Sequence, residues 1–208
     1  MKRTFKPISF VGGVVLAFSV CGAPQEDYNA GRKAYLAGDV VSAMTPLRRA
    51  ADAGYAPAQS LYGYILEKAE YNEEAAQYFR RAAEQGDPDG QYGLGILYAT
   101  GEGVARDAGA AREWLERAGR QGHGLAVVAL SQAFLSGRLG FKTDPADAAG
   151  LGWVRKAGEL DSIPALSYLA QGYRSGAFGA PDFKEAERLD ARIRELSPDN
   201  RKKNRKLK

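Results

Sequence analysis

Cysteine and histidine are almost absent from this chain of 208 residues, which has one of each, Cys21 and His123. A disulfide within the chain is therefore excluded, and the residues after Cys21 have no thiolate nucleophile or cysteine metal ligand. His123 lies between Gly122 and Gly124. We interpret it as a polar residue of a turn, because the chain has no second histidine with which to form a metal site. We expect no metal, no other cofactor and no catalytic residue.

A hydrophobic run long enough to span a bilayer is also lacking. The run that begins at Ile8 has roughly fourteen mostly apolar residues, whereas a membrane-spanning helix needs about 20. Basic residues precede this run and small residues follow it, which is typical of a signal peptide over residues 1–22. Cleavage before Ala23 predicts a periplasmic or secreted protein, whereas lipid attachment at Cys21 predicts a membrane-anchored lipoprotein. Val20 is bulky for the residue before a lipidated cysteine, which favours simple cleavage.

Charge is unevenly distributed along the chain, whose formal net charge is +4. The first 22 residues include three basic side chains and residues 201–208 include six, so acidic side chains exceed basic ones between them. We expect residues 197–208 to form a solvated, disordered basic tail. Contact of this tail with anionic lipid, cell-wall polymer or nucleic acid is the alternative. We expect no nucleic-acid partner for the folded part, and membrane contact only through the tail or a lipid on Cys21.

Four segments of the chain align without a gap, which indicates an internal repeat. They cover residues 50–69, 82–101, 118–137 and 157–176. In each segment a small residue is followed by a large residue and then by a second small one. The first small residues are Ala58, Gly90, Ala126 and Ala165, the large ones are Tyr62, Leu94, Leu130 and Leu169, and the second small ones are Gly63, Gly95, Ser131 and Ala170. Residues at these offsets share one face of an α-helix, so the pattern predicts the first helix of each unit, packed closely against a neighbouring helix.

A second helix follows in each unit and is marked by a residue that can cap its first turn. These residues are Asp39, Asn72, Asp107, Asp144 and Asp182. Pro145 suits the first helical position after Asp144. Pro46 lacks an amide donor and is expected to kink the second helix of the first unit. Five second helices predict five antiparallel helix pairs within one repeat domain, residues 23–196. The expected units are at about 27–54, 55–86, 87–122, 123–161 and 162–196.

Residues 93–122 closely resemble the Sel-one-like repeat, a relative of the tetratricopeptide repeat. The residues that match the family pattern are Leu94, Gly95, Tyr98, Gly101, Gly103, Val104, Asp107, Ala111, Trp114, Ala118 and Gly122. Gly90 departs from the pattern, which has alanine there. The other units match more loosely, and the resemblance extends over about residues 27–196. It implies an all-α fold, a right-handed α-solenoid, whose concave surface is lined mainly by first helices and holds proteins or peptides.

With the signal peptide, this resemblance implies an exported scaffold or adaptor of the bacterial cell envelope rather than an enzyme. First-helix residues between the packing positions are the candidate contacts with a protein or peptide partner. They are Ser60, Tyr64, Tyr92, Ile96, Val128, Gln132, Ser167 and Gln171. Ordinary surface exposure or packing between repeats is the alternative interpretation of each.

Two other functions are compatible with the sequence. Six tyrosines between positions 62 and 98 suit stacking on the sugar rings of a cell-wall or exported polysaccharide. A hydrolase is the more remote alternative, because the segments that resemble ligand loops are incomplete. Residues 101–106 lack the third glycine of a dinucleotide-binding loop, and residues 87–90 lack the remaining ligands of a calcium loop.

Overall fold

The computed structural model describes residues 23–197, which form ten α-helices and no β-strand. The helices are α1 (Ala23–Leu36), α2 (Val40–Asp52), α3 (Ala56–Lys68), α4 (Asn72–Glu84), α5 (Pro88–Thr100), α6 (Ala108–Arg120), α7 (Gly124–Leu135), α8 (Ala148–Glu159), α9 (Ile163–Ser175) and α10 (Phe183–Leu196). The expected signal peptide with Cys21, and the expected basic tail after Ser197, lie outside the described residues. Among residues 23–197, none of the helices combines the length and the hydrophobicity that a membrane crossing requires.

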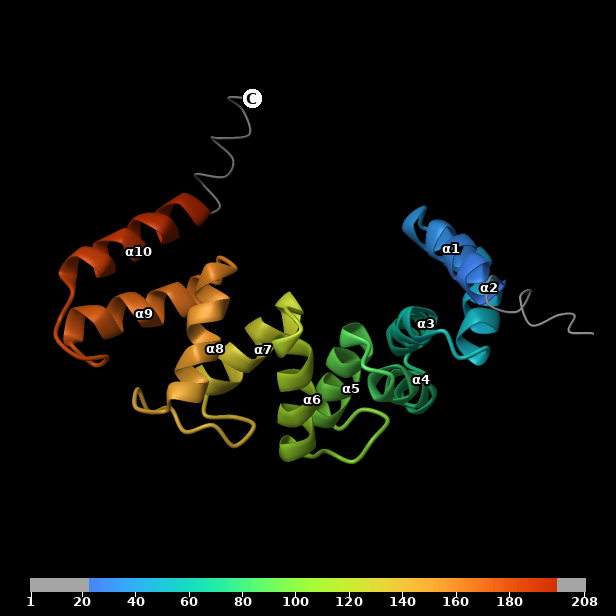
Figure 1. Cartoon of the computed structure of the whole chain (residues 1–208), viewed down its shortest axis with the longest axis horizontal. Helices are drawn as coiled ribbons and strands as arrows, with labels where there is room; N and C mark the ends of the chain where they lie inside the picture. The colour runs from blue at the N-terminus through green and yellow to red at the C-terminus, as the bar shows by residue number, and fades with distance from the viewer. Residues whose placement is uncertain (1–22, 198–208) are drawn as a thin grey trace, which may run out of the picture.

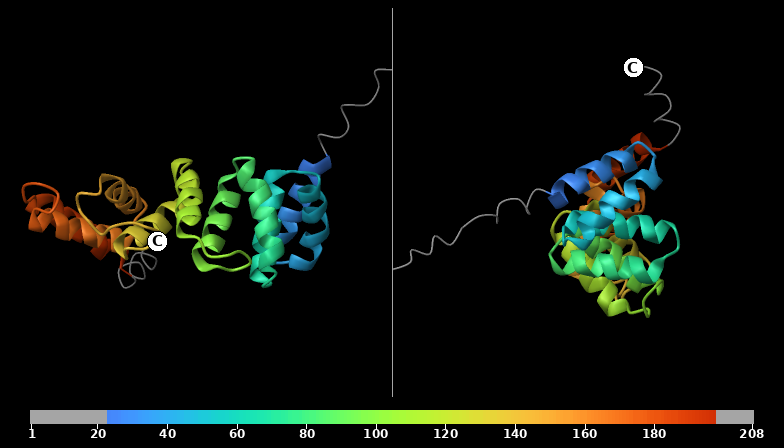
Figure 2. Two further views of the ribbon diagram at one scale, coloured as in Figure 1. Left: turned by 90° about the horizontal axis from the view of Figure 1, so that it is seen from below. Right: turned by 90° about the vertical axis from the view of Figure 1, so that its right-hand side faces the viewer.

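The ten helices form five antiparallel pairs that stack into an arc (Figure 1). Each odd-numbered helix packs against the even-numbered helix that follows it, and that helix packs against the first helix of the next pair. Figure 1 shows α1 and α10 at the two tips of the arc, with α3 and α5 toward its inside and α4 and α6 toward its outside. Figure 2 shows the pairs stacked along the length of the molecule. The predicted fold, an all-α, right-handed α-solenoid of five helix pairs, is confirmed.

The packing positions predicted from the repeat are buried in all four units that carry the pattern. The large residues have exposed fractions of 4% (Tyr62), 0% (Leu94), 0% (Leu130) and 5% (Leu169). The small residues on either side of them in the pattern are buried as well. Full burial of a leucine side chain contributes about 1.5–3 kcal/mol, so these positions account for much of the contact between helices. Helices α2 to α10 each lie within the unit expected for them. Helix α1 begins at Ala23, before the expected start of its unit at about residue 27.

Glycine is required where an aromatic ring fills the space beside a helix. A Cβ atom at Gly150 of α8 would lie 2.1 Å from the ring of Phe134 in α7. One at Gly93 of α5 would lie 2.5 Å from the ring of Phe79 in α4. Both rings are buried, with exposed fractions of 0% and 3%. The missing side chain at each glycine therefore allows a ring to lie against the helix backbone.

Two of the predicted helix starts are wrong. The N-cap of α4 is Tyr71, so Asn72 is the first residue of the helix and its side chain caps nothing. The N-cap of α8 is Asp147, three residues after the predicted Asp144. Asp144 instead accepts a hydrogen bond from the amide of Ala146, which forms a turn before the helix. The caps predicted at Asp39, Asp107 and Asp182 are confirmed.

The helix start predicted at Pro145 is wrong, and the kink expected at Pro46 stays a prediction. Pro145 precedes α8 instead of occupying its first position. Pro46 lies inside α2, which continues through it from Val40 to Asp52.

Glutamines join the first three units through buried hydrogen bonds. Gln59 in α3 and Gln91 in α5 each donate to the last turn of the preceding helix and accept from a glutamine that follows the next helix. The bonds are Gln59 Nε2 to Ala51 O (3.0 Å), Gln85 Nε2 to Gln59 Oε1 (2.7 Å), Gln91 Nε2 to Ala83 O (3.4 Å) and Gln121 Nε2 to Gln91 Oε1 (2.8 Å). The equivalent residues of α7 and α9, Val127 and Leu166, are buried and apolar. The contact between successive units thus changes from polar to apolar along the arc.

Two glycines of α8 give opposite expectations for substitution by alanine. Gly150→Ala places a methyl group against the buried ring of Phe134, so we expect the free energy of unfolding to fall by about 1–3 kcal/mol. A Cβ at Gly152 meets no atom within 4 Å, so Gly152→Ala should raise the free energy of unfolding by up to about 1 kcal/mol through helix propensity. Urea unfolding followed by circular dichroism measures both. Changes of the same sign in the two variants would contradict this packing.

Candidate functional site

A groove of about 490 Å³ lies on the first helices at the N-terminal end of the stack. Side chains of α1, α3 and α5 line it, together with the ring of Phe79 from α4 and with His123 and Leu125 at the start of α7. We call this cavity the N-terminal groove. Because α3 and α5 lie toward the inside of the arc in Figure 1, the groove belongs to the concave side of the solenoid.

Helix α1 contributes one continuous face to the groove. Tyr28, Arg32, Tyr35 and Leu36 line the cavity, and their spacing places them on one side of the helix. Gly31 is the buried residue of α1, and it packs against α2. The contact with α2 therefore orients α1 so that the side bearing Arg32 borders the groove.

Helix α3 presents a fixed aromatic ring. Ser60, Tyr64 and Lys68 line the groove at successive turns. Tyr64 is 40% exposed, its ring meets Tyr35 edge-on with 6.4 Å between centroids, and the Lys68 ammonium lies 5.1 Å from its centroid. Lys68 also pairs with Glu67 at 3.2 Å. Because neighbours restrain this ring, a partner can bind it at a low entropic cost.

His123 joins α5 to α7 at the groove. Its Nδ1 accepts a hydrogen bond from the amide of Ala126 (3.1 Å), which caps α7. Its Nε2 lies 3.0 Å from Oδ1 of Asp89, and its ring stacks on Tyr92 with 4.7 Å between centroids. Because Nδ1 accepts, the proton of a neutral ring is on Nε2 and is donated to Asp89. His123 therefore follows the turn in which it was predicted to lie, caps α7 and holds α5 and α7 together.

The electrostatics of the groove suit binding. Burial raises the pKa of the Tyr28, Tyr35 and Tyr92 hydroxyls, so these groups stay protonated at neutral pH and can donate hydrogen bonds. The hydrogen bond from His123 lowers the pKa of Asp89, which stays ionised. Within residues 23–197, no group of three or more histidine, cysteine or carboxylate side chains is placed to hold a metal ion. The groove can thus engage a partner through hydroxyl groups, charges and apolar contacts.

Four of the eight predicted contact residues come together in this groove: Ser60, Tyr64, Tyr92 and Ile96. Ser60 is 4% exposed, and its hydroxyl donates to Asp87 Oδ1 at 2.6 Å. Asp87 in turn caps α5, so Ser60 also supports the start of that helix. The structure thus places predicted residues from two successive repeats around one cavity.

The other four predicted residues lie away from the groove. Gln132 lines, with Ile96, a cavity of about 420 Å³ between α5, α6 and α7. Val128 is half-buried in α7, and Ser167 and Gln171 are exposed on α9. Their contact with a partner stays a prediction.

The contributions of α1 and of His123 to the groove were not predicted from the sequence. The first unit lacks the repeat pattern, so no residue of α1 was a candidate. The helical spacing of Tyr28, Arg32, Tyr35 and Leu36 is the signal that could have identified this face.

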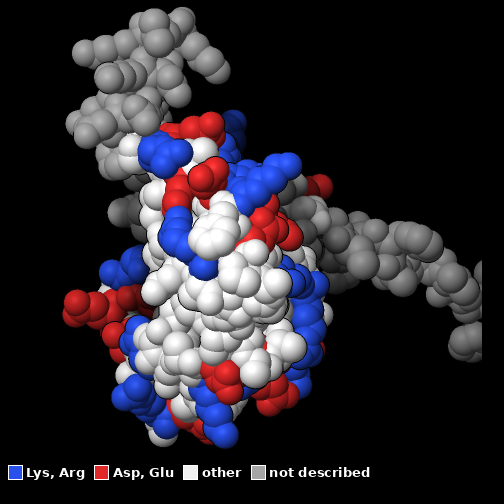
Figure 3. Space-filling view, turned by 90° about the vertical axis from the view of Figure 1, so that its left-hand side faces the viewer, with Lys and Arg blue, Asp and Glu red and all other residues white. Residues whose placement is uncertain are grey.

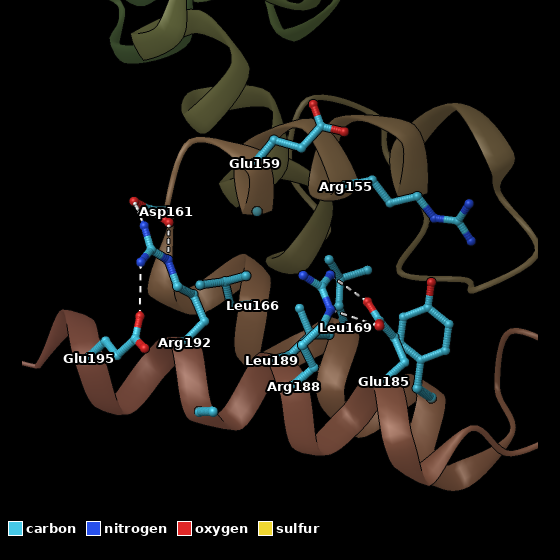
Figure 4. A pocket seen from close by; sticks show the side chains of 13 residues that line it. Arg155, Glu159, Asp161, Leu166, Leu169, Glu185, Arg188, Leu189, Arg192 and Glu195 are labelled. Atoms are coloured by element: carbon cyan, nitrogen blue, oxygen red, sulfur yellow. Dashed lines mark hydrogen bonds and ion pairs between the residues drawn. The ribbon is translucent and has the colours of Figure 1, made fainter.

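A second cavity, of about 650 Å³, lies between α8, α9 and α10 (Figure 4). Figure 4 shows Arg192 paired with Asp161 and Glu195, and Arg188 paired with Glu185. Figure 3 views this end of the molecule and shows charges of both signs interspersed around an uncharged area. No predicted contact residue lines this cavity, and these two arginines are already paired within the chain. The N-terminal groove is therefore the stronger candidate site.

Two of the helix pairs match a known repeat family. Residues 56–87 and 88–123 each match the sequence model of the Sel1 repeat, and they coincide with α3–α4 and α5–α6. The chain is 35% identical over 83 residues to the DAP3-binding cell death enhancer 1 of Rattus norvegicus. It is 47% identical over 45 residues to HRD3B, an ERAD-associated E3 ubiquitin-protein ligase component of Arabidopsis thaliana. These alignments cover 39% and 22% of this chain but 16% and 7% of the relatives, so the chain spans a small part of their length.

The fold is similar to the crystal structure of c5321, a protective antigen of uropathogenic Escherichia coli that displays an SLR fold. The TM-score is 0.73 at 28% identity, and the match covers 84% of this chain and 38% of that chain. Sel1 repeat proteins are protein-interaction scaffolds, and the family is typically non-catalytic. The two matching units show that residues 56–123 are Sel1 repeats, and the repeat pattern and the shared solenoid fold support the Sel1-like repeat family for the chain.

Proposed function

We propose that this chain is an exported interaction scaffold of the bacterial cell envelope, which binds a segment of a partner protein in the N-terminal groove. The observation that carries the proposal is a set of three exposed hydrophobic side chains around one cavity. Leu36 of α1, Tyr64 of α3 and Leu125 of α7 are 66%, 40% and 61% exposed, and all three line the groove. Exposed apolar side chains gathered around a concave site are typical of a binding surface.

A polypeptide suits this surface better than a polysaccharide does. A sugar ring stacks on a free aromatic face, but Lys68 lies over the ring of Tyr64 and His123 stacks on the ring of Tyr92. Besides these restrained rings, the groove offers hydroxyl groups, charges and aliphatic side chains. These groups suit the main chain and alternate side chains of an extended segment.

Tyr64 and Tyr71 are a matched pair of exposed tyrosines inside and outside the groove. The expected mature chain, immobilised and incubated with periplasmic extract, is used to recover the partner, and calorimetry with the purified partner measures its affinity. Tyr64→Ala should weaken binding about tenfold or more, because a restrained aromatic residue in a groove is typical of a binding hot spot. Tyr71 is 63% exposed but does not line the groove, so Tyr71→Ala should change the affinity by less than about twofold.

Thermal unfolding of both tyrosine variants is the control for a folding defect. Unchanged affinity of Tyr64→Ala would overturn the groove as the binding site. Retention by insoluble cell-wall material alone would support a polysaccharide ligand instead, and turnover of a substrate would support a hydrolase.

The location in the envelope depends on residues 1–22, whose pattern predicts export. Expression of the full chain in a bacterium, followed by mass spectrometry of the purified protein, determines the mature N-terminus. We expect Ala23 to be the first residue of protein recovered from the periplasm or the medium. A lipid on Cys21 in the membrane fraction would support the lipoprotein alternative. An intact N-terminus in the cytoplasm would contradict export.

A further inference from the structure

Four charged side chains line the N-terminal groove, and three of them already have a partner within the chain. Glu67 pairs with Lys68 at 3.2 Å, and Asp89 lies 3.0 Å from Nε2 of His123. The fourth is Arg32. Among residues 23–197, no hydrogen bond or ion pair involves its guanidinium group. Arg32 is thus the one cation of the groove without an ion-pair partner among the described residues.

Arg32 lies beside an exposed apolar side chain on the same face of α1. It is exposed and lines the groove, as does Leu36, which is 66% exposed. Four residues of an α-helix advance about 6 Å along its axis. The α1 wall of the groove therefore presents a basic and an apolar side chain whose attachment points are about 6 Å apart along the helix.

We propose that the partner segment in this groove carries a carboxylate side chain that pairs with Arg32 and an apolar side chain that packs on Leu36. This inference rests on the proposed function, because it names the chemistry of the segment bound at the same site. In an extended segment, side chains two residues apart lie on one face, about 6.6 Å from each other. The expected recognition motif is therefore an acidic residue and an apolar residue separated by one residue.

A carboxylate is the group that Arg32 recognises best. Its planar guanidinium donates two parallel hydrogen bonds to the two oxygens of a carboxylate. A bound segment also excludes water from the groove, which strengthens this pair relative to the exposed side chain of the free protein. A basic segment that contacts α1 would place its charge against that of Arg32. The α1 wall of the groove therefore favours acidic segments and disfavours basic ones.

A phage-displayed library of random peptides, selected on the expected mature chain, tests this inference. Arg32→Glu is compared with Lys33→Glu, which makes the same change of charge at a neighbouring exposed residue that does not line the groove. The unaltered protein and Lys33→Glu should enrich the acidic and apolar motif. Fluorescence anisotropy should show that Arg32→Glu binds the selected peptide about tenfold or more weakly.

A charge reversal in the peptide separates recognition from a structural effect. A peptide with lysine in place of its acidic residue should bind Arg32→Glu more tightly than it binds the unaltered protein. A variant that merely damaged the fold would bind neither peptide, and circular dichroism checks that each variant is folded.

Selected peptides without an acidic preference would overturn the pairing, as would equal losses of affinity in Arg32→Glu and Lys33→Glu. Either result leaves the proposed function intact if Tyr64→Ala still reduces peptide binding. If no selected peptide depends on Tyr64, the proposed function fails, and this inference fails with it.

Discussion

The close approach of helices at residues with little or no side chain is the constraint on which the stack depends. Phe79 occupies the space beside Gly93, Phe134 the space beside Gly150, and Phe178 the space beside Gly172. A Cβ at these glycines would lie 2.5, 2.1 and 2.0 Å from the ring. Dispersion contacts weaken within a fraction of an ångström of extra separation, so a wider spacing of the helices would forfeit this packing. The contact of Phe79 with Gly93 joins α4 to α5, so this kind of packing also links one helix pair to the next, as expected of a repeat protein.

The same helical periodicity that forms the core also determines which side chains line the groove. Tyr62 and Leu94 are 4% and 0% exposed and lie between helices. Tyr64 and Ile96, two residues further along the same helices, line the groove. Successive residues of a helix are rotated by 100° about its axis. When Tyr62 and Leu94 pack between helices, the residues two positions later therefore point to another side. The lining of the groove thus follows from the order of small and large residues that holds the stack together.

Contacts that repeat along the chain could be predicted from the sequence, and contacts that occur once could not. The burial of Leu94 and Leu130 follows from a pattern present in four units. The contact of His123 with Asp89 joins residues 34 positions apart and occurs at one junction, so no local pattern indicates it. Asp144 and Asp147 are both suitable caps, and the path of the preceding turn decides between them. Half of the predicted contact residues line the groove, because the other half lie on α7 and α9, farther along the arc.

The groove side chains without a partner among the described residues, Arg32 and Leu36, lie on α1, the first helix of the described stack. In the middle of the arc, neighbouring units satisfy one another, as His123 does with Asp89. Helix α1 packs mainly against α2, and residues 23–197 supply no further helix beside it. Arg32 and Leu36 therefore keep the exposure that an additional unit would remove. Under the proposed function, a partner segment bound there supplies the charge and the apolar surface that a neighbouring repeat provides elsewhere, and an end of the solenoid acts as its binding site.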